Sequence, residues 1–338
     1  MYPVNPELMD YLEKNHRLTN IRFYYDDLLR FSDYMPVHDK EGKDTLWLNV
    51  YYPEFEHAEI EANLNKIYTL LHSDGDVDVL PFLKVDSIHF CTFGNSKPFR
   101  IRVRNILNDN YTNFYIKKAD ASRIYGLELE EILSPNRINF LLYKDTLIEE
   151  HILGIPGDVF IDQHLENCNP LEKAQIAKEF VKFNERCMIG LLGDMRSYNY
   201  VVIPAHDFDQ VVYRIRAIDF DQQCYEGNLK IYLPQYFKEN IKMVELVQEK
   251  LKPNSIEQYK KEVRSAIAKR ASTDSRLEHL IAIMKKDTIS KPESVEELRT
   301  ALLKLTYNSQ FKRCETMGEI LEAGLNFVMR NYRNSHIR

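Results

Sequence analysis

The sequence predicts an α+β protein, with strands concentrated in its first half and helices in its second. Three observations lead to this prediction. Short strand-like runs separated by turn residues recur between Asp44 and Glu150. A later pair of strand-like runs, 200–203 and 211–218, flanks a polar turn. From Gln235 onward, apolar residues recur at helical spacing almost to the end of the chain.

Length and composition limit the class of protein. With 338 residues, the chain can bury a large core in one domain or two lobes. Its net charge of −6 does not favour a nucleic-acid partner. No apolar run approaches a membrane span, and we expect no signal peptide, because the first five residues carry no basic side chain. The five scattered cysteines argue against a zinc site and fit reduced thiols, so we expect a cytoplasmic location. The lack of a long apolar run also leads us to expect no membrane partner.

The first 84 residues carry structural patterns but no recognisable chemistry. Helical spacing predicts helices over 6–14, 26–34 and 54–71, and a strand is expected over 44–52. We interpret residues 1–84 as an extension that packs on the following lobe. A structural or regulatory cap is favoured over a separate functional module.

Strand signals over 87–93 and 99–103 flank a turn that begins at Gly94. A tight turn lets backbone N–H groups approach phosphate oxygens, so this turn is a candidate phosphate-binding segment. A plain hairpin turn remains the alternative. Lys97 and Arg100 are nearby and can supply positive charge where further glycines are missing.

Four elements are expected between this turn and residue 190. The strand 112–118 ends in Lys117 and Lys118, and the helix 120–133 contains three glutamates. Glu128 precedes Ile132 by one turn and so shares its core-facing side, with Glu130 and Glu131 as the competing candidates. A hairpin over 138–143 and 146–150 and a long amphipathic helix over 170–189 follow.

The most informative stretch runs from Leu191 to Gln222. Gly193-Asp194 follows an apolar segment, Asn199 comes five residues after Asp194, and Asp219-Phe220-Asp221 ends the second strand of a hairpin. Phosphoryl transfer needs a carboxylate near the attacking hydroxyl, and it needs an amide and a carboxylate to hold Mg²⁺. We assign Asp194 to the first role, and Asn199 with Asp219 to the second.

This frame resembles the catalytic core of the protein-kinase-like superfamily. Asp194 to Asn199 resembles its catalytic loop, and Asp219-Phe220-Asp221 resembles its metal-binding Asp-Phe-Gly segment. The His-Arg-Asp signature is missing, and Asp221 stands where the family has glycine. The pattern is therefore more similar to aminoglycoside and choline phosphotransferases, and more loosely to the isocitrate dehydrogenase kinase/phosphatase.

The resemblance implies a bilobal kinase-like fold, with a small antiparallel-sheet lobe and a mainly helical lobe. The corresponding ranges are 1–84 for the extension, 85–152 for the first lobe and 153–338 for the second. The resemblance also implies nucleotide-binding roles for four groups of residues: Lys117 on the phosphates, Glu128 orienting that lysine, Gly94 in the phosphate turn, and Glu149 and His151 in the hinge that meets the adenine.

Arg196 stands where many kinase-like enzymes carry a lysine that touches the transferring phosphate. An Arg paired with a neighbouring acid is an equally good interpretation of that residue. The expected function is ATP- and Mg²⁺-dependent phosphoryl transfer to a hydroxyl of a small molecule or a protein. The alternatives are a pseudokinase, which binds a nucleotide or acts as a scaffold without catalysis, and transfer of AMP on a kinase-like fold.

Overall fold

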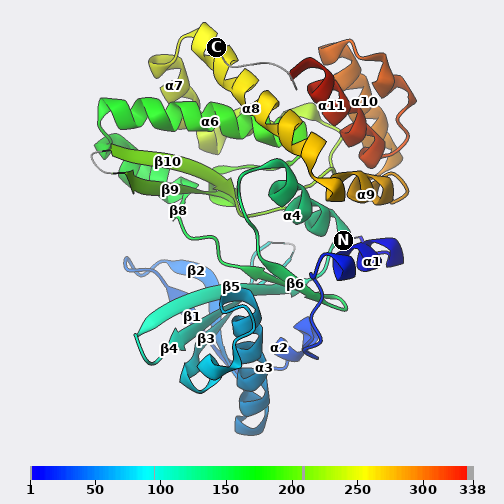
Figure 1. The fold of residues 1–338 in the computed structure, drawn as a ribbon. Coiled ribbons are helices and arrows are strands. Elements are labelled where there is room, and N and C mark those ends of the chain that lie inside the picture. Colours follow the sequence, from blue (N-terminus) through cyan, green and yellow to red (C-terminus); the bar gives the residue numbers. More distant parts are fainter. Residues whose placement is uncertain (1, 95, 208–209, 333–338) are drawn as a thin grey trace. The chain divides into compact units, whose positions relative to one another are not determined.

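The computed structural model describes residues 2–94, 96–207 and 210–332 of the chain. These residues form two compact units. The sheet unit comprises Met9–Asp120 and Ile138–His151. The helical unit comprises Met1–Leu8, Ala121–Arg137 and Ile152–Arg338. The expected α+β class is confirmed, because a large antiparallel sheet and many helices are both present (Figure 1).

The sheet unit is built on a seven-stranded antiparallel sheet with the order β1-β2-β3-β4-β5-β7-β6. The bounds of its strands are β1 Asp33–His38, β2 Asp44–Tyr51, β3 Leu83–Cys91, β4 Phe99–Asn105, β5 Asn110–Lys118, β6 Phe140–Tyr143 and β7 Thr146–Glu150. All six neighbouring pairs in this sheet are antiparallel. The hairpins expected around Gly94 and around residue 144 are both present.

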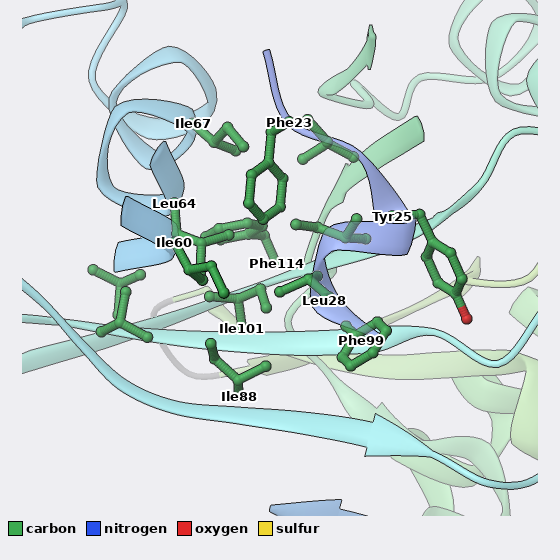
Figure 2. Close-up of a cluster of buried hydrophobic side chains, with 14 of the residues drawn as sticks. Phe23, Tyr25, Leu28, Ile60, Leu64, Ile67, Ile88, Phe99, Ile101 and Phe114 are labelled. Atoms are coloured by element: carbon green, nitrogen blue, oxygen red, sulfur yellow. The ribbon is translucent and has the colours of Figure 1, made fainter. Parts of the chain in front are cut away.

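One face of this sheet is apolar and is covered by helix α3, Glu54–His72. Alternation along β4 places Phe99, Ile101 and Val103 on that face, and each is at most 1% exposed. Figure 2 shows Ile60 and other α3 side chains among the strand residues of this core. The opposite face therefore carries the alternate, polar residues of the same strands.

The first 84 residues contribute strands β1 and β2 directly to the sheet. Strands β1 and β2 pair with each other, and β2 continues the sheet onto β3. The helix expected over 26–34 is wrong in extent, because α2 covers only Tyr25–Leu28 and β1 begins at Asp33. Pro36 is tolerated in β1 because this strand lies at the sheet edge.

The helical unit combines a small sheet with most of the helices. Its three strands have the order β10-β9-β8, and the two long ones form the expected hairpin. The bounds are α4 Ala121–Leu133, β8 Ile155–Pro156, α5 Gly157–Val159, α6 Pro170–Gly190, β9 Tyr200–Asp207, β10 Gln210–Ala217, α7 Ile241–Lys250, α8 Pro253–Thr273, α9 Ser275–Met284, α10 Pro292–Thr306 and α11 Met317–Tyr332. Helix α1, Pro6–Lys14, begins in this unit and ends in the sheet unit.

Helix α6 leads the chain into the stretch from Leu191 to Gln222. Asn169 caps its start by accepting from the backbone N–H groups of Leu171 and Glu172. Leu191 ends it in the left-handed conformation, with φ 53°. None of the helices in the described ranges has the length and apolar character needed to cross a membrane.

Candidate functional site

The predicted catalytic loop begins at Gly193, where two backbones approach closely. Its N–H donates to the carbonyl oxygen of Gln222, at 3.1 Å. A Cβ atom at this position would lie 3.0 Å from that oxygen and 2.9 Å from Cγ2 of Ile231. Only glycine fits without moving the neighbouring segment, so Gly193 fixes how the loop lies against the residues that follow β10.

Asp194 and Asn199 are held together within this loop. Asp194 has φ 57°, a left-handed conformation that Asp tolerates better than most residues. Its backbone N–H donates to the carbonyl of Ile231 at 3.1 Å. The Asn199 amide donates to the Asp194 carbonyl at 2.7 Å, and its Nδ2 lies 3.5 Å from Asp194 Oδ2. A spacing of five residues thus becomes a direct contact.

The loop is also tied to the acidic segment after β10. The N–H of Ile218 donates to the Asn199 carbonyl at 3.0 Å, which fixes the chain one residue before Asp219. Burial raises the pKa of the Tyr198 phenol, and the nearby Asp194 and Asp219 carboxylates raise it further. The structure therefore brings three predicted residues, Asp194, Asn199 and Asp219, into one region of the helical unit.

Arg196 is paired with acids, which was one of its two interpretations. Its Nε lies 2.8 Å from Asp194 Oδ1, and its Nη1 lies 2.9 Å from Glu239 Oε1. The guanidinium carbon also lies 5.0 Å from the centre of the Phe237 ring. Glu239 was not anticipated from the sequence, because it lies 43 residues away in an otherwise ordinary helical region.

Arg123 is the most important residue that the sequence analysis missed. It lies in the first turn of α4 and is 1% exposed. Its Nη2 lies 2.5 Å from Asp219 Oδ1, and its Nε lies 2.5 Å from Asp221 Oδ1. Both acids of the Asp-Phe-Asp segment therefore bind one buried guanidinium. The sequence gives no signal for this contact, because the partners are 96 and 98 residues apart.

Asn240 stabilises the loop that contains Met195, and the sequence did not predict this role. It is fully buried, and its amide donates to the carbonyls of Met195 at 2.9 Å and Pro234 at 2.8 Å. Its Oδ1 accepts from the hydroxyl of Tyr200 at 2.9 Å. A single amide thus joins the loop that contains Met195, the start of β9 and the segment before α7.

The three glutamates of α4 have different surroundings. Glu128 is fully buried, Glu131 Oε1 lies 3.2 Å from Nη1 of Arg276, and Glu130 accepts from Ser134 and Asn136. Hydrogen bonding to Asp274 raises the pKa of Arg276 most, and Glu131 and Glu128 raise it further. The burial of Glu128 matches the core-facing position expected for it. Its role in orienting Lys117 stays a prediction.

In the sheet unit, Lys117 and Glu149 form a buried ion pair. Lys117 Nζ lies 2.8 Å from Glu149 Oε2, and the two residues are 7% and 6% exposed. Their strands β5 and β7 are paired, with Tyr115 directly opposite Glu149. Glu149 was expected in a hinge, and the structure gives its side chain a direct partner in the candidate phosphate-binding lysine.

Three further ionisable side chains, His151, Arg100 and His89, lie near this ion pair or near one another. The ring of His151 lies 5.7 Å from the ring of Tyr115, and burial with the charge of Arg100 lowers the pKa of His151. Arg100 Nη2 lies 3.2 Å from Nδ1 of His89. Lys117, Glu149 and His151, three of the predicted residues, thus gather around Tyr115.

Gly94 occupies the turn between β3 and β4 with φ +84°, a conformation that favours glycine. Apart from its chain neighbours, the described residues place no heavy atom within 4 Å of the position its Cβ would take. Asn95, the next residue of the expected phosphate turn, lies outside the described residues. The phosphate-binding role of Gly94 therefore stays a prediction.

The residues expected to hold Mg²⁺ supply oxygen ligands, which suit this hard cation. Asn199 and Asp219 would hold it, with Asp219 also accepting from Arg123 and from the N–H of Asp221 at 3.1 Å. Within residues 2–94, 96–207 and 210–332, no three His, Cys, Asp or Glu side chains come together as a metal site. The expected pair of Asn199 and Asp219 contains only one side chain of these four types, so it is a smaller set of ligands than such a group of three.

No protein-family model matches the chain, and a search of curated proteins finds no significant match.

Proposed function

We propose that this protein is a kinase-like phosphotransferase, which transfers a phosphoryl group from ATP to a hydroxyl of a small molecule or a protein. The observation that best supports the proposal is the contact of Asp194 with Asn199, in a loop tied to the residue before Asp219. These are the residue types that phosphoryl transfer uses for the acceptor and for Mg²⁺. A cytoplasmic location belongs to the proposal, supported by five cysteines that are all free.

In this reaction, the Asp194 carboxylate accepts the proton of the acceptor hydroxyl as its oxygen attacks the terminal phosphorus. The bond from that phosphorus to the bridging oxygen breaks, and ADP leaves. Mg²⁺ bound with the nucleotide would neutralise charge on the phosphate oxygens. Arg196 orients Asp194 through the 2.8 Å contact with Oδ1, and Asn199 holds the loop backbone at the same residue.

The sheet unit gives separate support for nucleotide binding. Lys117 is a buried cation oriented by Glu149, and a lysine at the end of a strand is the group that kinase-like proteins place on phosphates. The proposal assigns Lys117 to the phosphates, with Glu128, Gly94, Glu149 and His151 as the other nucleotide-binding residues.

The test is ATP binding and turnover with four proteins: wild type, Asp194→Asn, Lys117→Met and Asp162→Asn. Asp162 is a matched control, because its side chain is 70% exposed and meets only Lys242, at 3.4 Å, among the ion pairs described. Asp194→Asn should bind ATP as wild type does and lose turnover by about 100-fold or more. Lys117→Met should weaken ATP binding about tenfold or more, and Asp162→Asn should change neither. A wild type that binds no ATP would refute the proposal.

The pseudokinase remains a second candidate, and one observation favours it: both acids of the Asp-Phe-Asp segment are bound by Arg123. Binding of ATP without turnover against a panel of hydroxyl acceptors would select this candidate. ATP labelled on the α- and γ-phosphates separates the remaining alternative. Label from the γ-phosphate on the acceptor supports phosphoryl transfer, whereas label from the α-phosphate shows AMP transfer.

A further inference from the structure

Helix α4 docks tightly on the segment from Asp219 to Gln223 through one face of its first two turns. The hydroxyl of Ser122 donates to the carbonyl of Gln223 at 2.6 Å. One turn later, a Cβ atom on Gly126 would lie 2.9 Å from Cβ of Phe220. Between these two contacts, Arg123 reaches both acids of the segment. The helix therefore fixes the backbone and the charges of the segment together.

The Arg123 side chain is buried, whereas the two aspartate side chains that it contacts are partly exposed. The Arg123 side chain is 2% exposed, whereas the side chains of Asp219 and Asp221 are 34% and 28% exposed. A guanidinium uses its planar fork to bind two carboxylates at once, which a single ammonium group does less well. Without a cation between them, the two carboxylates would repel each other and separate.

We propose that Arg123 acts as a permanent cation of this site. Its guanidinium holds the Asp219 and Asp221 carboxylates together, a task that would otherwise need a divalent metal ion. The acid pair is then assembled before any nucleotide or metal arrives, and a metal that approaches without nucleotide competes with the guanidinium for the same carboxylates. This inference deepens the proposed function, since it takes Asp219 as the metal-binding residue of that site. It makes Arg123 a positioning residue that determines the metal requirement.

The helical unit offers a matched comparison in Arg276. This arginine also bridges two acids, with Nη2 2.8 Å from Asp274 and Nη1 3.2 Å from Glu131. Asp274 caps α9 by accepting from the N–H of Arg276, so this cluster has a clear structural task. Removing either arginine leaves two acids without their shared cation, but only the Arg123 site is expected to take a metal in its place.

The experiment measures Mn²⁺ affinity by calorimetry, and Tm with EDTA, Mg²⁺ or Mn²⁺, all without nucleotide. The proteins are wild type, Arg123→Gln and Arg276→Gln. Arg123→Gln should melt lower than wild type in EDTA, regain part of the lost Tm with either metal, and bind Mn²⁺ about tenfold or more tightly than wild type. Arg276→Gln should melt lower without any recovery by metal.

Two further variants keep the test decisive. Arg123→Gln combined with Asp219→Asn should lose the metal response, because one of the two carboxylates is gone. If Arg123→Gln does not fold, Arg123→Lys retains the charge without the fork and should show a smaller gain in Mn²⁺ affinity. Equal Mn²⁺ affinity in wild type and in both Arg123 variants, or a lower Tm of Arg123→Gln that no metal restores, would overturn the inference.

The readout contains no ATP, so its result is independent of the turnover experiment. A gain of metal binding in Arg123→Gln with no ATP binding in wild type would support the inference and remove the proposed function. ATP turnover together with an unchanged metal affinity in the variant would do the reverse.

Discussion

Lys117 Nζ lies 2.8 Å from Glu149 Oε2 on paired strands, and both residues are less than a tenth exposed. Removing one partner of a buried ion pair leaves the other charge uncompensated, which costs about 3–5 kcal/mol. Lys117→Met and Glu149→Gln should therefore each lower the free energy of unfolding by about that amount. The double variant should be more stable than the sum of the two losses predicts. Urea unfolding of the four proteins measures this coupling, and strictly additive losses would contradict it.

Asn240→Ala should destabilise the helical unit more than Tyr200→Phe does. The first variant leaves the buried carbonyls of Met195 and Pro234 without this donor, at a cost of about 2–3 kcal/mol. The second removes only the hydroxyl that donates to Asn240, at a cost of about 1 kcal/mol. Chemical denaturation gives both values. A larger loss for Tyr200→Phe would show that the amide does not support the loop as described.

Two glycine-to-alanine substitutions in helices should have opposite signs. In α4, the new Cβ of Gly126→Ala would lie 2.9 Å from Phe220 Cβ and 3.1 Å from Gln223 Cβ, so overpacking should cost about 1–3 kcal/mol. In α11, the new Cβ of Gly324→Ala would meet no heavy atom of the described residues within 4 Å, its own helix backbone and chain neighbours apart, so this change should stabilise by up to about 1 kcal/mol. Tm and denaturant midpoints measure both effects. Stabilisation by Gly126→Ala would show that α4 does not press on the acidic segment.

Stability at acid pH should depend on His89. Burial and the charge of Arg100 lower the pKa of this imidazole from 6.5 to about 4. Between these values the unfolded chain binds a proton that the folded chain does not, so stability contributed by His89 is lost as the pH falls from 6.5 towards 4. His89→Gln should flatten this part of the stability profile relative to wild type. Parallel profiles for the two proteins, measured by urea unfolding across the range, would disprove the assignment.

Local patterns in the sequence determined most elements of the fold. Apolar residues at helical spacing predicted α1, α3 and α6 close to their observed bounds, because that spacing decides which side of a helix is buried. Strand alternation puts Phe114 and Ile116 on one face of β5, and both side chains are buried in the core.

The candidate site was predictable only where its residues are close in sequence. Asp194 and Asn199 lie in one loop, and a loop of that length allows a direct contact between them. Strand β1 was not predicted. Most of its side chains are exposed, so it lacks an alternation of apolar and polar residues, and it becomes a strand by pairing with β2 at the edge of the sheet. Arg196 had two equally good interpretations until its acidic partners were located.

Tertiary structure alone decided the charge arrangement. Arg123 meets Asp219 and Asp221 across almost a hundred residues, and Lys117 meets Glu149 across 32. Such contacts depend on which faces of helices and strands pack together, and a charged residue has the same local pattern whether it meets solvent or a buried partner. The sequence by itself contains, at this spacing, the residue types that phosphoryl transfer uses. Only the fold decided that a guanidinium binds both acids of the segment proposed to hold the metal.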